Sequence, residues 1–197
     1  MSRTRFAAIA TFVVLSCAGC ADDGSPKADP SPSPSTSMPA STATTPTAVP
    51  AYLDRFSERQ RQAYDDAVQA YQDFAGQQAT YMAAGEATPA AKRFYVRHTA
   101  DWQTFWATLQ QRESDGVRVE GTGKTLRTRP TKIRLYGDGT GSVNLDVCGV
   151  STGVKVSQNG SPIPQPKPVP TIVRVGMVKL DGESHWRVLY ERVGPKC

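Results

Sequence analysis

Apolar residues recur with a helical period in three successive segments of this chain. The first, residues 57–85, begins with a capping box formed by Ser57 and Gln60 and carries a stripe of large apolar side chains. Residues 88–96 begin with the pair Thr-Pro, which favours a helix start, and residues 99–112 present a second aromatic stripe. Such stripes usually belong to a core, so the pattern predicts three packed helices rather than a cofactor site.

After Gly116 the apolar period changes from about 3.6 residues to two, the spacing of half-buried strands. Glycine-rich turns are expected at residues 137–141, 158–160 and 181–182. The expected strands surround residues 117–119, 133–135, 143–147, 154–156, 172–180 and 186–190. Helices followed by an antiparallel sheet predict an α+β fold, with the N-terminal helices packed on one face of a curved, cone-like sheet.

Residues 1–50 show neither period. Arg3 and Arg5 precede ten uncharged residues, 6–15, which is about half of the ~20 apolar residues that a membrane-spanning helix needs. A short apolar stretch behind positive charges is typical of a secretory signal peptide. We therefore expect residues 1–16 to direct export and then to be removed.

The segment Leu-Ser-Cys-Ala-Gly-Cys that ends at Cys20 resembles the lipobox of bacterial lipoproteins. In that family a cysteine after small residues is acylated and becomes the mature N-terminus. The resemblance implies lipidation at Cys17, with Cys20 as the alternative, and anchoring through that lipid to the outer face of the membrane. An ordinary signal peptide, cut near Ala21 and followed by release, is the competing interpretation.

The next segment, residues 17–50, is dominated by Pro, Ser, Thr and Ala. This composition buries too little apolar surface to offset chain entropy and predicts a disordered tether. Its reach lies between about 30 Å as a coil and about 90 Å as an extended chain. The expected organisation is therefore a signal peptide, a tether and a single domain over residues 51–197. The style of the tether resembles lipoproteins of high-GC actinobacteria.

The charge and the cysteine content argue against nucleic-acid binding, a cysteine nucleophile and a metal site. Lys and Arg number 23 against 18 Asp and Glu, a net charge of +5 that is too small for a nucleic-acid footprint. Cys148 and Cys197 are the only thiols of the domain, and in an exported protein a pair predicts a disulfide rather than a nucleophile. No His and Cys spacing supplies three or four metal ligands, so neither a metal nor a cofactor is expected.

The order of elements over residues 53–197 resembles the cone-shaped nuclear-transport-factor-like superfamily, which includes SnoaL-like and ketosteroid-isomerase-like proteins. The likeness rests on the aromatic first helix, on Trp106 and Leu109, and on the closing segment 182–188. In similar lipoproteins a central strand ends in a cysteine followed by an acidic residue. Cys148 fits this pattern, but the acidic residue is missing.

The resemblance implies a pocket at the open end of the sheet. Five polar residues are candidates to reach it: Tyr64, Tyr71, His98, Asp101 and Asp146. No catalytic motif of the isomerase-like members matches this chain, so no catalytic residue is assigned. His98 and His185 are isolated in the sequence, and residues 121–124 lack the full spacing of a phosphate-binding loop.

The sequence therefore predicts a non-enzymatic binding or envelope-support module at the cell surface. A pocket enzyme of the isomerase or hydrolase kind is one alternative. Another is an interaction module that uses the proline-rich arm, residues 161–170, expected to be a stiff loop between strands. Basic residues at about every second position of 124–134 indicate a solvated strand face that suits an anionic wall polymer. An envelope protein is the other candidate partner, and the oligomeric state is left open.

Overall fold

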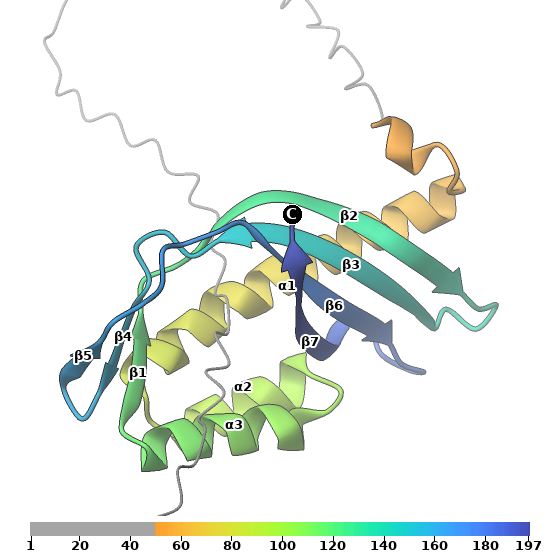
Figure 1. The fold of residues 1–197 in the computed structure, drawn as a ribbon. Helices are drawn as coiled ribbons and strands as arrows, with labels where there is room; N and C mark the ends of the chain where they lie inside the picture. Colours follow the sequence, from red (N-terminus) through yellow and green to blue (C-terminus); the bar gives the residue numbers. More distant parts are fainter. Residues whose placement is uncertain (1–49) are drawn as a thin grey trace, which may run out of the picture.

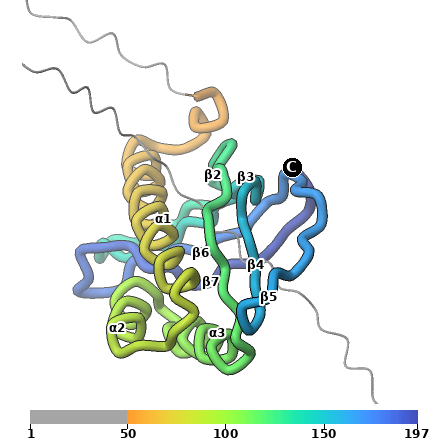
Figure 2. The backbone as a smooth tube through the Cα atoms, turned by 90° about the vertical axis from the view of Figure 1, so that its left-hand side faces the viewer, coloured from red at the N-terminus to blue at the C-terminus, as the bar shows by residue number. Residues whose placement is uncertain are grey.

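The computed structural model describes residues 50–197, so the expected signal peptide, Cys17, Cys20 and almost all of the tether lie outside the described residues. Helical and strand elements follow one another in the order expected for the α+β class. They are η1 (Ala51–Leu53), α1 (Glu58–Ala84), α2 (Pro89–His98), α3 (Trp102–Ser114), β1 (Val117–Glu120), β2 (Lys124–Leu135), β3 (Gly141–Val150), β4 (Lys155–Gln158), β5 (Ser161–Ile163), β6 (Thr171–Lys179) and β7 (Arg187–Lys196). The helices gather on one side of a curved antiparallel sheet, as Figures 1 and 2 show, which confirms the predicted fold class.

Local capping signals set the ends of the first two helices. Ser57 accepts a hydrogen bond from the Gln60 amide, and the Gln60 side chain accepts one from the Ser57 amide, so the predicted capping box forms. Gly85 ends α1 in the left-handed conformation (φ 64°), which glycine adopts at little cost. Thr88 caps α2, with Pro89 in its first turn.

The third helix begins later than its sequence pattern predicts. Residue Thr99 is fully buried and extended; it pairs with Val188 of β7 in a short parallel bridge, while its hydroxyl donates to the Tyr95 carbonyl. Asp101 caps α3 instead, accepting a hydrogen bond from the Thr104 amide. The contact of Thr99 with β7 therefore keeps this residue extended, and α3 begins at Trp102 instead.

The strands form two sheets rather than the single antiparallel sheet that the sequence pattern predicts. A four-stranded antiparallel sheet has the order β2-β3-β6-β7, and a three-stranded sheet has the order β1-β4-β5. The hairpin β4–β5 interrupts the larger sheet between β3 and β6 and pairs through β4 with β1. Asn159 (φ 50°) and Gly160 (φ 78°) form its tight turn, as the Asn-Gly pair predicts.

The proline-rich arm is part strand and part loop. Its first residues, Ser161–Ile163, form β5 at the edge of the small sheet, where Pro162 needs no ladder donor. The expectation of a loop over all of 161–170 is therefore wrong for these three residues. Residues 164–170 lie outside the strands and are exposed, which agrees with a stiff connection.

Side chains of α1 and of the residues before it cover the free edge of β2. Arg55 donates to the carbonyl of Pro130, Tyr64 to that of Thr128 and Gln60 to that of Ile133. A strand edge with unpaired carbonyls is a template for unwanted pairing, and these donors satisfy three of them. They also fix α1 along the inner side of β2.

The core lies between the helices and the inner face of the four-stranded sheet. Phe74 of α1 stacks on Phe94 of α2 (ring centroids 5.5 Å apart) and meets Phe105 of α3 edge-on at 5.7 Å. Alternate residues of β3 and β6, including Leu145 and Val175, are fully buried and belong to the same hydrophobic core. Apolar side chains thus cover most of the inner face of β3 and β6.

Candidate functional site

Positive charge concentrates on the outer face of the four-stranded sheet, the face turned away from the helices. Arg129 of β2 is opposite Asp146 of β3, which in turn is opposite Arg174 of β6, and Arg174 is opposite Arg192 of β7. Cross-strand partners point to the same side, so these four side chains form one row across the sheet. We call this surface the outer basic face and define it by six exposed cations: Arg127, Arg129, Lys132, Arg134, Arg174 and Arg192.

The cations of this face lack matching acids. Asp146 makes one contact, with Arg174 at 3.9 Å, and the Arg174 side chain is 59% exposed, so this ion pair contributes little. Within residues 50–197 none of the other five cations has a carboxylate within 4.0 Å. The outer basic face therefore carries an uncompensated positive charge that an external anion can neutralise.

A cavity of about 430 Å³ lies between η1 and this face. Its lining combines guanidinium groups, an acid and apolar surface: Ala51, Tyr52, Arg55, Arg127, Arg129, Pro130, Thr131, Asp146, Cys148 and Ile172. The Arg129 guanidinium lies over the ring of Tyr52, 5.3 Å from its centroid. Ala51, the second of the described residues, belongs to this lining.

Cys148 and Cys197 form a disulfide beside the cavity, with Cα atoms 6.0 Å apart. Because Cys148 belongs to the outer side of β3, the bond fastens the C-terminal end of the chain to that side of the sheet. The Cys197 amide also donates to the carbonyl of Pro170, which ties the end of β7 to the start of β6.

The five residues suggested for a pocket are not brought together. Tyr64 donates to the β2 edge, Tyr71 points to β7, and Asp101 caps α3. His98 ends α2 with its ring 4.9 Å from that of Phe94. Asp146 alone of the five lines the 430 Å³ cavity, and it does so on the outer face rather than in the cone interior.

A polar cluster that the sequence pattern does not indicate lies inside the fold. The Tyr71 hydroxyl of α1 donates to Oε1 of Glu191 on β7 at 2.9 Å. Burial raises the pKa of Glu191 to about 7, against smaller opposite effects of hydrogen bonds from Tyr71 and Gln78. Burial also raises the pKa of Tyr71 and of Tyr95, and the nearby Glu191 carboxylate acts in the same direction.

Glu191 is not among the residues that the sequence suggests for a pocket. The alternation of apolar and polar residues does not correctly predict which face of β7 its side chain occupies. Trp186 and Val188 face the core, and continued alternation would put Glu191 on the outer face. A register shift between Gly176 and Met177 leaves Leu189 without a partner and turns Glu191 inward. No sequence signal marks this bulge.

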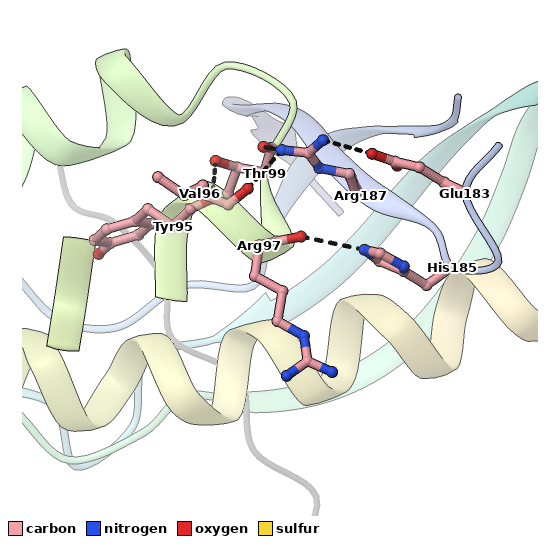
Figure 3. Close-up of polar contacts among 7 residues, drawn as sticks. All are labelled: Tyr95, Val96, Arg97, Thr99, Glu183, His185 and Arg187. Atoms are coloured by element: carbon pink, nitrogen blue, oxygen red, sulfur yellow. Dashed lines mark hydrogen bonds and ion pairs between the residues drawn. The ribbon is translucent and has the colours of Figure 1, made fainter. Parts of the chain in front are cut away.

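The C-terminal end of α2 is held by the hairpin between β6 and β7, as Figure 3 shows. The Arg187 guanidinium donates to the carbonyls of Val96 and Thr99 and pairs with Glu183 at 2.8 Å. A ring nitrogen of His185 lies 3.3 Å from the Arg97 carbonyl. Cations at a helix C-terminus are favourable, so Arg187 has a structural role here.

His98 is a poor candidate for an acid–base group. Burial lowers the pKa of His98, and the neighbouring charges of Arg97, His185 and Arg187 act in the same direction. Asp101, the carboxylate near His98 in the sequence, accepts a hydrogen bond from the Thr104 amide as the cap of α3. His98 and Asp101 therefore do not form a catalytic pair.

Residues 50–197 contain no cluster of three or more His, Cys, Asp or Glu side chains suited to a metal. None of the helices in this part of the chain is long and apolar enough to cross a membrane.

No family model matches the chain, and no curated protein matches it. Solved structures with a similar arrangement include the intermembrane space region of the chloroplast protein ARC6, at 10% identity and a TM-score of 0.43, over 66% of this chain and 98% of that one. A periplasmic fragment of TraM is similar at 10% identity and a TM-score of 0.38, over 71% of this chain and 98% of that one. Function is therefore inferred from the side chains of the site.

Proposed function

We propose that this protein is a non-enzymatic binding module of the cell envelope that recognises an anionic partner through its outer basic face. The observation that carries the proposal is the set of six exposed cations on one sheet face, with Asp146 as the only acid among them. Long-range attraction by such a face raises the local concentration of anions and the rate of encounter. A wall polymer and a lipid headgroup are both anionic components of an envelope.

The lining of the cavities supports binding over catalysis. Neither the 430 Å³ cavity nor the smaller hollow beside Pro89 is lined by Tyr71 or Glu191, the pair with acid–base capacity. A general acid or base must come within hydrogen-bond reach of its substrate, and the two oxygens of this contact are hydrogen-bonded to each other between α1 and β7. Neither of these two cavities thus offers the Tyr71–Glu191 pair to a substrate, as the isomerase or hydrolase alternative would require.

Export and lipid anchoring belong to the same proposal. The Cys148–Cys197 disulfide suits an oxidising compartment outside the cytosol, where the predicted signal peptide would deliver the chain. Acylation at Cys17, or alternatively at Cys20, would then hold the domain near the outer face of the membrane through its tether.

The anchor can be tested by metabolic labelling with an alkyne analogue of palmitate. We expect the wild-type chain to be labelled and Cys17→Ser to lose most of the label. Retention of the label in Cys17→Ser with loss in Cys20→Ser would transfer the role to Cys20. Equal labelling of both variants and of the double variant would disprove the anchor.

The binding proposal predicts a specific loss on charge reversal. The full chain in neutral detergent should bind inorganic polyphosphate, a soluble polyanion, and Lys132→Glu combined with Arg134→Glu should weaken binding about tenfold or more. The matched control, Arg93→Glu with Lys167→Glu, changes the net charge equally but lies on α2 and the proline-rich arm. Titration calorimetry at several salt concentrations measures both. Equal losses in the two double variants would mean that net charge alone drives binding and would refute a role for the face.

A further inference from the structure

We infer that the outer basic face docks on the surface of an anionic phospholipid bilayer, with the cavity between η1 and β2 receiving lipid phosphate groups. This inference rests on the proposed function, because it names the partner of the same face. It is carried by the chemistry of the cavity, the layout of the charges and the position at which the tether joins the domain.

The cavity combines phosphate-binding groups with apolar surface. Arg55, Arg127 and Arg129 line it, and a guanidinium can bind a phosphate through two parallel hydrogen bonds. Two of the three are already held in place: Arg129 over the Tyr52 ring, and Arg55 by its 3.3 Å hydrogen bond to the Pro130 carbonyl. Pre-positioned side chains lose less conformational freedom when a ligand binds.

The ends of β2 add exposed apolar side chains to these cations. Leu126, at one end of the strand, is 49% exposed, and Tyr136, just beyond the other end, is 53% exposed. Apolar and aromatic side chains mixed with Lys and Arg are the composition of segments that lie in a membrane–water interface. Four cations of β2, Arg127, Arg129, Lys132 and Arg134, lie between these two residues in the sequence.

The layout of the charges favours a surface over a strand-like partner. Four of the six cations follow β2, and the row from Arg129 through Asp146 to Arg174 and Arg192 crosses the sheet at an angle to them, so together they form a two-dimensional array. A linear polymer would be matched by a row or groove of charge along one direction. An array across the sheet matches the phosphate groups of a bilayer, which are also distributed in two dimensions.

The start of the domain places this face near the proposed anchor. The described chain begins at Pro50, and the next residue, Ala51, lines the cavity. In Figure 1 η1 lies beyond the start of α1, beside β2. Residues 18–50 connect Cys17 to Ala51, so an acylated Cys17 would confine the cavity within about 30 to 90 Å of the bilayer. Such confinement gives the face a high effective concentration of headgroups.

The test measures which side of the domain meets the bilayer. The full acylated chain is reconstituted into vesicles of phosphatidylcholine alone or with added phosphatidylglycerol, both containing brominated lipid that quenches tryptophan. Tyr136→Trp reports on the end of β2, and Val96→Trp, at a 43% exposed position of α2, is the matched control. The parent chain, with its three tryptophans, supplies the background to be subtracted.

We expect quenching of Tyr136→Trp to increase at least twofold when phosphatidylglycerol is added, with no increase for Val96→Trp. Adding Lys132→Glu and Arg134→Glu to the Tyr136→Trp chain should remove the increase. Equal quenching of the two reporters, or an increase that survives the charge reversal, would overturn the inference. If the chain binds polyphosphate in detergent but shows no docking on the vesicles, the bilayer is refuted as the partner and the proposed function stands. If the chain neither binds polyphosphate nor docks on the vesicles, the inference and the proposed function are both refuted.

Discussion

Replacing Cys148 and Cys197 together by alanine should lower the free energy of unfolding by about 4 kcal/mol. The disulfide closes a loop across a sequence separation of 49 residues, and in the chain-entropy model a loop of this size restricts the unfolded chain by about that amount. A typical domain has only about 5–15 kcal/mol of stability, so the loss would be a large share of the total. The bond also holds the C-terminal end of β7 beside the cavity, and this end should fray first in the variant.

Urea unfolding of the oxidised wild type, the reduced wild type and the double variant measures the effect. The reduced wild type should resemble the double variant, because both lack the cross-link while the former keeps the sulfur atoms. Peptide mapping without reductant should recover the two cysteines in one linked fragment. Equal midpoints for oxidised and reduced protein, or free alkylation of both thiols in the native protein, would contradict the prediction.

Glu191→Gln should make the protein more stable above neutral pH and reduce the dependence of its stability on pH. Burial raises the pKa of Glu191 from 4.5 to about 7, so the folded state disfavours the ionised carboxylate. The neutral carboxyl carries no such penalty below pH 4.5. As the pH rises from 4.5 to 7 the unfolded chain releases its proton first, and the folded state loses up to about 2–3 kcal/mol of relative stability.

The effect of the Glu191 carboxylate must be separated from that of the groups around it. Tyr71 and Gln78 of α1, Tyr95 of α2 and Arg112 of α3 belong to the surroundings of this cluster. Glutamine keeps an acceptor for the Tyr71 hydroxyl but cannot ionise, so the difference between wild type and Glu191→Gln isolates the carboxylate. Urea midpoints from pH 4 to pH 8 should coincide at the acid end and separate as the pH rises. Parallel curves over this range would show that Glu191 is not responsible.

Tyr71→Phe provides a second test of the Glu191 carboxylate, and the titration of His98 must be accounted for in both. Removing the Tyr71 hydroxyl takes away a hydrogen bond that favours the ionised carboxylate, so the pKa of Glu191 should rise further and the protein should be less stable at pH 8. His98 titrates in an overlapping range with the opposite sign: its lowered pKa means that stability is lost as the pH falls. The His98 contribution is common to both proteins and cancels in the difference.

Much of the secondary structure depends on residues that are close together in the sequence. The capping box at Ser57, the left-handed Gly85 and the Thr88-Pro89 start need only their own neighbours, and each forms as expected. The Asn159-Gly160 turn is of the same kind. The α+β class followed from the change of apolar period after Gly116, because a helical period and a period of two cannot be satisfied by the same element.

The candidate site was predictable in part. The period of two along residues 124–134 is enough to identify the basic side of β2 from the sequence. Arg174 and Arg192 join that face only through the register of β6 and β7. Arg55 lines the adjacent cavity only because the residues before α1 reach the edge of β2. A single strand shows which residues alternate, but the partner strands decide which charges share one face.

The sequence by itself determined the class of fold, the caps of the first two helices and the tight turns. It also suggested that the two cysteines of the domain pair with each other. Tertiary structure alone decided the division into two sheets, the late start of α3 at the Thr99–Val188 bridge and the inward direction of Glu191. The reason is the range of the interactions involved. Caps and turns depend on hydrogen bonds within a few residues, whereas a bulge or a bridge arises where distant strands and helices must fit together, and no local pattern records that fit.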